Sequence, residues 1–473
     1  MNVRTKIVAT LGPASRTPAI IRQLTEAGCD IFRINFSHGS PEDREALLGA
    51  VRAVEVELDR PLAVVGDLCG PKIRVGPLTG APVELQTGAR VDILRDAVEG
   101  DASGFSTTMP ELVDELAVGE PVLLDDGRIR LEVEATVPGE RARCRVVHGG
   151  PLGPGKGVNL PRTRLSLSSL TEKDRADVDW ILGRELDYVA LSFVREASTL
   201  ATLRGLLRAG GSEAHVIAKV EKPEALERIE EIVAEADAVM VARGDLGVEM
   251  DLPEVPLAQK RIADLCQTAG KPCIIATQML ETMTHSPQPT RAEVSDVANA
   301  VLDRADAVML SGETAVGEFP VETVRMMNRI AARTESFAGS EGSGLRITGG
   351  AWRTAAALAG AVHAIVDGEE ICAVAVFTAT GATARMLSKS RLPLPILALT
   401  QNRPTARRMQ LYHGVIPALA DAPEHTREVL ALASRLAMDR GIATSGDKLV
   451  VVSGRPIGVP GATNTMVVHT VGR

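Results

Sequence analysis

The chain has 473 residues and a formal net charge of −9, with 45% hydrophobic, 24% charged and only 2% aromatic residues. This length predicts two or three domains. The acidic balance argues against a general binder of nucleic acids or membrane surfaces, although local clusters such as Lys72 and Arg74 can still attract small anions. Because aromatics are scarce, the core must be aliphatic, which suits parallel strands buried on both faces.

The N-terminus and the cysteines bear on the cellular compartment. Residues 1–6 contain no signal-peptide core, and no apolar run is long enough to span a bilayer. The six cysteines form no C-x-x-C pair, and most lie inside apolar segments. These features are typical of free thiols in a reducing compartment, so we expect a cytoplasmic protein.

Short apolar runs alternate with amphipathic helical patterns along the first two thirds of the chain. The expected strands are residues 6–11, 30–36, 62–68, 188–193, 215–220, 238–242, 273–277 and 307–310. Thr17 before Pro18 marks a helix start, and Thr171 with Asp174 resembles a capping box. Eight strand–helix alternations predict an α/β fold, a (β/α)₈ TIM barrel. An open doubly wound sheet is the alternative, but no G-x-G-x-x-G motif follows an early strand.

The alternation is interrupted once, after the third expected strand. Strand-like segments occupy residues 91–94, 122–124, 128–133 and 143–147. Asp126-Gly127 between two of them is a hairpin turn signal. Active sites of such barrels lie at the face where this insertion begins, so we expect an inserted all-β lid domain there.

A further α/β unit follows the barrel. Residues 339–344, made of glycine, serine and one glutamate, indicate a linker. A helix is expected at 352–366, and strands at 373–377, 396–399, 449–452 and 466–469. The expected domains are therefore a catalytic barrel at 1–69 and 166–338, a lid at 70–165, and a C-terminal α/β regulatory domain at 339–473.

Polar residues stand at the C-terminal end of almost every expected barrel strand. Lys219 and Glu221 end the fifth strand, Asp245 follows the sixth, and Thr277 ends the seventh. Any single one of them is explained as well by a helix cap, but so many together indicate a site. Two carboxylates completed by water and substrate oxygens suit Mg²⁺ or Mn²⁺. The other strand-end residues are Arg33, Asn35, Ser37, His38, Asp67, Ser192, Arg243, Gln278, Ser311 and Glu313.

Two chemistries fit Lys219, which shares a strand face with Glu221. It forms a Schiff base, or it stays charged and stabilises a transferring phosphoryl group or an enolate. Nearby carboxylates and a metal favour the charged form, because carboxylates raise the pKa of a lysine. The residues therefore favour phosphoryl transfer.

Longer motifs in the chain resemble the pyruvate kinase family. They lie at residues 5–15, 33–39, 70–74, 156–161, 241–247, 276–281, 289–293 and 309–315. They occur in the family order and run nearly from end to end. The resemblance implies a phosphotransferase that moves the phosphoryl group of phosphoenolpyruvate to ADP, giving pyruvate and ATP in the last step of glycolysis.

The resemblance also implies roles for individual residues. Glu221 and Asp245 match the protein ligands of the divalent metal. Lys219 matches the lysine that stabilises the phosphoryl group and the enolate, Arg33 the phosphate-binding arginine, and Thr277 the threonine linked to protonation of the methylene. The substrate carboxylate would bind the N–H groups of Ala242, Arg243, Gly244 and Asp245, and the nucleotide and phosphates would meet Asn35, His38, Arg74 and Lys156.

One departure from the family concerns K⁺. Many members bind this ion through residues matching Asn35, Ser37, Asp67 and position 68, with a glutamate at position 72. Here Leu68 offers no side-chain oxygen, and position 72 is a lysine. We expect that the Lys72 ammonium replaces the ion and that K⁺ is not required. The alternative is that Lys72 is a solvated residue at the lid hinge.

The C-terminal domain carries a separate anion signal. Thr378, Thr380, Gly381 and Thr383 connect a strand to a helix, where N–H groups can hold a phosphate. This segment resembles the effector loop of the family, with 453–456 and 458–465 beside it, although ordinary helix capping also explains it. A sugar phosphate and a nucleoside monophosphate both fit as the effector. The family further implies allosteric regulation and a homotetramer.

Two other functions remain as alternatives. A metal-dependent lyase of pyruvate-like substrates fits a related barrel, but it has no use for a lid or an effector domain. A catalytically inactive binding protein predicts the loss of Lys219, Glu221, Asp245 or Thr277, and the sequence retains all four.

Overall fold

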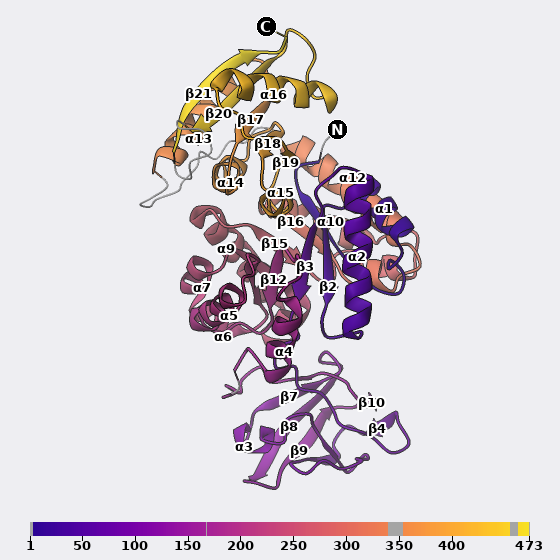
Figure 1. Cartoon of the computed structure of the whole chain (residues 1–473). Helices are drawn as coiled ribbons and strands as arrows, with labels where there is room; N and C mark the ends of the chain where they lie inside the picture. Colours follow the sequence, from indigo (N-terminus) through magenta and orange to yellow (C-terminus); the bar gives the residue numbers. More distant parts are fainter. Residues whose placement is uncertain (1–2, 167, 339–352, 455–461, 473) are drawn as a thin grey trace.

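The computed structural model describes residues 3–472 except 167, 339–352 and 455–461. The expected linker at 339–344 and part of the expected loops at 453–465 therefore lie outside the described residues. Figure 1 shows a central barrel, an all-β domain at one end and an α/β domain at the other. Within the described ranges, no helix is long and apolar enough to cross a membrane. All six cysteines are free thiols, as expected.

Eight parallel strands close into a barrel in the order β1-β16-β15-β14-β13-β12-β3-β2. Pairing of β1 with β2 completes the circle, so the expectation of a TIM barrel is confirmed and the open sheet is excluded. All eight predicted strands are present, with ends that differ by at most two residues. They are β1 (Lys6–Thr10), β2 (Ile31–Asn35), β3 (Ala63–Asp67), β12 (Tyr188–Leu191), β13 (His215–Val220), β14 (Ala238–Ala242), β15 (Cys273–Ala276) and β16 (Ala307–Leu310).

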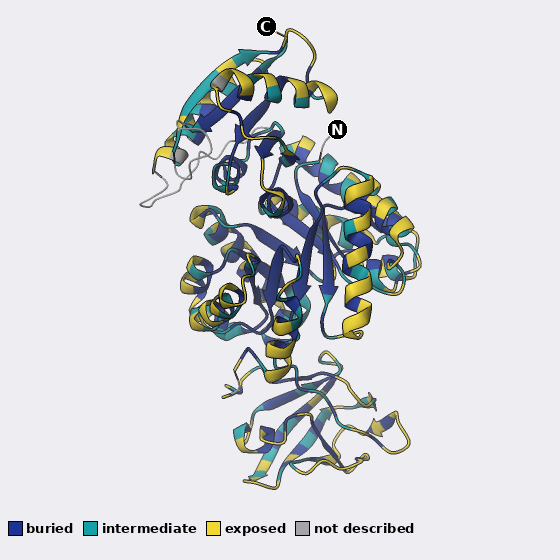
Figure 2. Cartoon of the chain, in the orientation of Figure 1, coloured by how far each residue is buried: buried dark blue, intermediate teal, exposed yellow. Residues whose placement is uncertain are grey.

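Helices surround the barrel and bury one face against it. In Figure 2 the strands are buried along their length, while exposed residues lie on the outer faces of the helices. Thr17 and Thr171 cap their helices as predicted, the latter in a full capping box with Asp174. The helices are α1 (Pro18–Ala27), α2 (Pro41–Glu57), α4 (Glu172–Ile181), α5 (Ala197–Ala209), α6 (Pro223–Glu227), α7 (Ile229–Glu235), α8 (Arg243–Glu249), α9 (Val255–Ala269), α10 (Arg291–Leu302), α11 (Gly312–Ala315) and α12 (Pro320–Ala338), with 3₁₀ turns at Leu252–Glu254 and Glu281–Thr284.

The inserted domain lies between β3 and α4 in the chain and has its own apolar core. A six-stranded sheet in the order β11-β7-β8-β9-β5-β6 packs with a two-stranded sheet of β10 and β4. The predicted turn at Asp126 joins antiparallel β7 and β8, and its φ of 56° is left-handed. Its elements are β4 (Val83–Leu85), β5 (Arg90–Leu94), β6 (Gly104–Ser106), α3 (Leu112–Glu115), β7 (Pro121–Leu124), β8 (Ile129–Val137), β9 (Arg141–His148), β10 (Gly150–Leu152) and β11 (Val158–Asn159).

The C-terminal domain is a five-stranded sheet in the order β19-β18-β17-β20-β21, with β21 antiparallel. The four predicted strands and the helix expected after Thr383, α14, are present, but β19 and the helices α15 and α16 were not predicted. The elements are α13 (Arg353–Gly368), β17 (Ile371–Phe377), α14 (Ala382–Lys389), β18 (Ile396–Thr400), α15 (Arg403–Met409), β19 (Val415–Leu419), α16 (Thr426–Asp439), β20 (Lys448–Gly454) and β21 (Thr463–Thr470).

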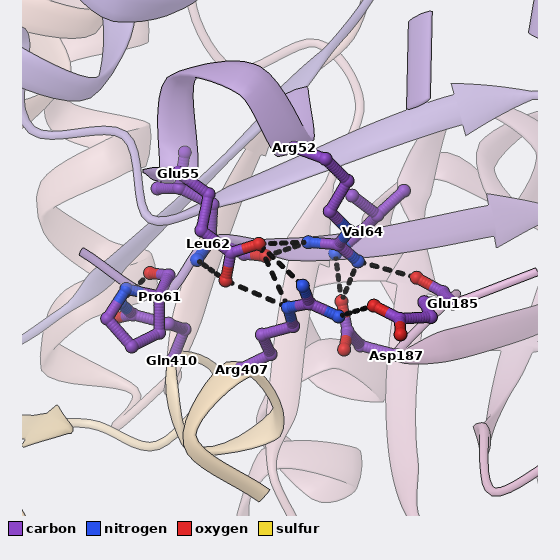
Figure 3. Close-up of polar contacts among 9 residues, drawn as sticks. All are labelled: Arg52, Glu55, Pro61, Leu62, Val64, Glu185, Asp187, Arg407 and Gln410. Carbon is purple, nitrogen blue, oxygen red and sulfur yellow. Dashed lines mark hydrogen bonds and ion pairs between the residues drawn. The ribbon is translucent and has the colours of Figure 1, made fainter. Parts of the chain in front are cut away.

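A buried ionic network attaches the C-terminal domain to the start of β3 (Figure 3). Arg407 of α15 lies 2.7 Å from Oε2 of Glu55, and Arg52 also pairs with that carboxylate at 3.2 Å. Arg52 reaches Asp187 at 2.9 Å, and Asp187 accepts the N–H of Val64 at 2.8 Å. The domain therefore binds the N-terminal face of the barrel, opposite the strand ends with the predicted site.

Candidate active site

Lys219 is the centre of a charge cluster at the C-terminal ends of β3, β12 and β13. Its Nζ lies 3.1 Å from Oδ1 of Asp67 and 3.0 Å from Oε1 of Glu221. It also donates a hydrogen bond to Oγ of Ser192 at 2.6 Å. The side chain is buried. Three neighbouring strand ends therefore hold one cation in place, which preorganises its charge.

Burial and partners set the protonation of this cluster. Burial lowers the pKa of Lys219, but the opposite charges of Asp67 and Glu221 outweigh it, and the net pKa is raised. Burial raises the pKa of Glu221, with Asp245 and Asp67 adding to the rise and Lys219 opposing it. A lysine held in its charged form is a poor amine nucleophile, so the structure disfavours the Schiff-base alternative.

Arg33 brings a second cation to the same cluster from β2. Its Nε donates to Oδ2 of Asp67 at 2.6 Å, and its Nη1 donates to Oγ1 of Thr10 at 3.0 Å. Asp67 thus lies between Arg33 and Lys219. Burial raises the pKa of Asp67, but these two cations outweigh it, and the net pKa is lowered.

Glu221 and Asp245 form the oxygen-donor part of the site. Glu221 accepts the N–H of Phe193 at 2.7 Å, and Asp245 lies in the first turn of α8, 3.3 Å from the Nζ of Lys72. The two carboxylates are close enough that the negative charge of Asp245 raises the pKa of Glu221. Among the described residues, no group of three or more His, Cys, Asp or Glu side chains is arranged to hold a metal. Two carboxylates with water and substrate oxygens fit Mg²⁺, which keeps part of its hydration shell in proteins.

Thr277 occupies a strained position beside the start of α8. Its φ is 68°, a left-handed value that is costly for a β-branched residue, and Gln278 follows at 54°. Oγ1 of Thr277 accepts the N–H of Gly244 at 2.7 Å. Arg243 donates to the carbonyl of Thr277 at 2.8 Å and pairs with Asp296 at 2.6 Å. The Arg243 side chain therefore braces Thr277, which fixes the hydroxyl against α8.

A region of positive charge lies next to the cluster, around His38. Burial and the cations Arg74, Arg33 and Lys72 all lower the pKa of His38, so its neutral form is favoured. Its Nδ1 lies 3.3 Å from Nδ2 of Asn35. Converging cations of this kind suit a polyphosphate.

Lys156 lies in the inserted domain next to Arg74, whose Nη1 donates to the carbonyl of Gly155 at 2.9 Å. The Nζ of Lys156 pairs with Oδ1 of Asp125 at 2.7 Å, inside the inserted domain. The structure therefore brings together the predicted residues of the barrel, including Asn35 and His38, while Arg74 and Lys156 come from the inserted domain.

Comparison with known proteins assigns this arrangement to a family. The model described as "Pyruvate kinase, barrel domain" matches residues 2–324, and "Pyruvate kinase, alpha/beta domain" matches residues 356–469. The chain belongs to the pyruvate kinase family. It is 42% identical to the pyruvate kinase of Methylorubrum extorquens over 471 residues, which cover 99% of this chain and 98% of that protein. It is 41% identical to the enzyme of Geobacillus stearothermophilus over 475 residues, which cover 100% and 81%.

A solved structure agrees with the sequence comparison. The fold matches a pyruvate kinase from Cryptosporidium parvum with a TM-score of 0.90 and 31% identity, covering 99% of this chain and 96% of the other. The reaction of pyruvate kinases is phosphoryl transfer from phosphoenolpyruvate to ADP in glycolysis. The chain is therefore a phosphotransferase, and members of its family generally use Mg²⁺.

Several features of this pyruvate kinase site were missed or underrated by the sequence reading. Asp67 was expected as a strand-end residue with a role only toward a monovalent cation, yet it contacts both Arg33 and Lys219. Phe193 was not expected at the site, although its φ of 54° directs its N–H to Glu221. No sequence signal identifies an aromatic residue as a left-handed donor. Ser192 was noted as a strand end, and its hydroxyl holds Lys219.

Of the predicted effector residues, Thr378, Thr380 and Gly381 lie in the loop between β17 and α14 of the C-terminal domain, and Thr383 lies in the first turn of α14. The N–H of Gly381, which has a φ of 80°, donates to Oγ1 of Thr378 at 3.0 Å. The hydroxyls of Thr383 and Thr463 lie 2.6 Å apart. Hydroxyls and a left-handed glycine thus gather at the start of α14.

Proposed function

We propose that the charge cluster around Lys219 carries out phosphoryl transfer in this chain. The observation that supports it most is a charged lysine held between Asp67 and Glu221 at 3.1 and 3.0 Å. Lys219 would donate to oxygens of the moving phosphoryl group and of the enolate, where negative charge develops. Arg33 would bind the phosphate, and both cations are already oriented before substrate arrives.

Glu221 and Asp245 would hold the divalent cation. Mg²⁺ supplies positive charge that neutralises phosphoryl oxygens when it is bound. The N–H groups at the start of α8, from Ala242 to Asp245, would receive the substrate carboxylate. The hydroxyl of Thr277, fixed against Gly244, would take part in protonation at the methylene carbon of the enolpyruvate.

Two measurements test this assignment. Pyruvate formation from phosphoenolpyruvate and ADP is followed in a lactate dehydrogenase-coupled assay, with and without Mg²⁺. Binding of Mn²⁺ to the free protein is followed by electron paramagnetic resonance. We expect Glu221→Gln and Asp245→Asn to weaken Mn²⁺ binding about tenfold or more, since each removes one ionic ligand. Unchanged Mn²⁺ affinity in both variants would remove these residues from the metal site.

We also propose that the enzyme needs no K⁺, with Mg²⁺ or Mn²⁺ as its cation. Asp67 is already neutralised by Arg33 and Lys219, and Leu68 has no side-chain oxygen. The Nζ of Lys72 lies 3.3 Å from Asp245, so a cation is already present there. The coupled assay in buffer free of Na⁺ and K⁺ tests this. A manyfold rise in turnover on adding K⁺ would disprove it.

The loop from Thr378 to Thr383 is proposed to bind a phosphorylated metabolite. Its support is the cluster of hydroxyls with Gly381 at the start of α14, an eight-residue helix. Thr380 would add a further hydroxyl. We expect sigmoidal dependence on phosphoenolpyruvate that a sugar phosphate or a nucleoside monophosphate relieves. Hyperbolic kinetics unaffected by a panel of such metabolites would count against it.

Assembly, location and domain limits are proposed on family grounds. We propose a cytoplasmic homotetramer, supported by Leu252 and Leu257, apolar side chains that are 71% and 67% exposed near the start of α9. Sedimentation equilibrium tests the tetramer. We also propose the domain limits 1–69 with 166–338, 70–165 and 339–473, which limited proteolysis tests.

A further inference from the structure

A buried polar cluster joins the inserted domain to the barrel beside Glu221 and Asp245. Asn159, the last residue of β11, donates from Nδ2 to Oε1 of Glu249 at 2.8 Å. The Nζ of Lys222 lies 2.8 Å from the same oxygen. The roles proposed above use none of these three side chains.

Stability alone does not account for this cluster. Glu249 is 2% exposed, Asn159 6% and Lys222 8%. All three line a pocket at the junction, together with Lys72 and Phe193. Oε2 of Glu249 is buried and has no hydrogen-bond partner among the described residues. A buried carboxylate oxygen without a partner is destabilising. Fold stability therefore does not explain why a carboxylate occupies this position.

The position of the cluster supplies that explanation. Lys222 directly follows Glu221, and Glu249 ends α8, the helix whose first turn carries Asp245. Asn159 belongs to the inserted domain and pairs with β7 opposite Leu123. One carboxylate therefore touches the strand end of Glu221, the helix of Asp245 and the inserted domain. α8 spans seven residues, about two turns, so a shift at Glu249 moves Asp245 with it.

We propose that Glu249 is a positioning residue that sets the angle of the inserted domain over the strand ends of Glu221 and Asp245. The inference rests on the roles proposed for these two carboxylates. Asn159 is the donor from the inserted domain, and Lys222 supplies the opposite charge. Closure of this domain excludes water from the reacting phosphoryl group and completes the ADP site.

The test removes the contact from the side of the inserted domain. Asn159→Ala deletes the donor and leaves the Lys222–Glu249 pair intact. We expect kcat/KM for ADP to fall about tenfold, the value of one hydrogen bond to a charged group, with a smaller change for phosphoenolpyruvate. The matched control is Arg164→Ala. It removes an exposed ion pair with Glu227, 3.2 Å long, and should leave both values unchanged.

A charge swap separates this role from general packing. Asn159→Asp places a second carboxylate against Glu249, and we expect a larger loss than with Asn159→Ala. Adding Glu249→Gln moves the carboxylate to the inserted domain, restores one hydrogen bond and keeps a partner for Lys222. The double variant should regain most of the ADP kinetics, because the two changes are coupled.

A distance measurement reads the angle itself. Spin labels at Val118 and Val56, which are 65% and 75% exposed, report the separation of the inserted domain and α2. The distribution should broaden in Asn159→Ala and narrow again in the double variant. If Asn159→Ala matches the wild type in ADP kinetics and label distance, or if the swap is no better than Asn159→Asp alone, the inference is wrong. The label distance is measured without metal or substrate. The result therefore holds even if Glu221 and Asp245 prove not to bind the metal.

Discussion

Replacing Lys219 by methionine tests the central role in the proposed mechanism. The ammonium lies within 3.1 Å of two carboxylates and 2.6 Å of Ser192, so the substitution removes a fully preorganised cation. Deleting one such donor from an active site typically lowers kcat by about 10²–10³. Because Lys219 opposes the raised pKa of Glu221, its loss raises that pKa further. Metal binding, which needs the carboxylate, should weaken as well.

The same substitution has a cost in stability that must be measured separately. Asp67 keeps its pair with Arg33, but Glu221 loses its only ionic partner among the described residues. Removing one member of a buried pair typically costs about 3–5 kcal/mol of unfolding free energy. Coupled assays at saturating Mg²⁺ and both substrates give kcat, while chemical denaturation followed by circular dichroism gives the stability. A folded Lys219→Met enzyme with kcat within tenfold of the wild type would refute the role.

Three further substitutions probe other parts of the molecule. Lys72→Glu should make turnover depend on added K⁺, because it removes the resident cation; equal activity with and without K⁺ would contradict this. Burial lowers the pKa of His215 to about 4, against an ordinary 6.5. As pH falls, His215 therefore takes up a proton in the unfolded state before it does so in the folded state. Stability should therefore fall as pH drops from 6.5 to 4, by on the order of 3 kcal/mol, and denaturation midpoints of His215→Leu should fall less. Arg407→Met leaves Glu55 buried without this cation and should cost about 3–5 kcal/mol in urea denaturation, whereas the exposed pair lost in Arg228→Ala should cost under about 1 kcal/mol.

The barrel could be predicted because its strands are locally distinct. Each is a short aliphatic run, buried on both faces, between amphipathic helices with recognisable caps such as Thr171. Once eight parallel strands close, their C-terminal ends meet at one face, so Lys219, Glu221 and Asp245 had to converge. The grouping followed from topology and needed no knowledge of side-chain contacts.

Elements stabilised by distant partners could not be predicted. α15 contains Arg407 and Arg408, which a local reading places at the surface, yet both are buried. The partner of Arg407 is Glu55, 352 residues away in sequence. Asn159 and Glu249 are 90 residues apart and meet only because the inserted domain covers the end of α8. Hydrophobic periodicity carries no information on such charge pairs.

The two faces of the barrel use buried charge in opposite ways. At the N-terminal face, Lys389 and Asp306 pair at 2.6 Å with 1% and 0% exposure, and the ions there serve to attach the C-terminal domain. At the C-terminal face, Glu221 has a raised pKa and Thr277 holds a strained left-handed backbone. Strain and incompletely balanced charge lower stability, so they persist where binding of substrate and metal compensates for them. Substitutions at the first face should therefore act mainly on unfolding free energy, whereas those at the second, such as Lys219→Met, should change kcat and KM in addition to stability.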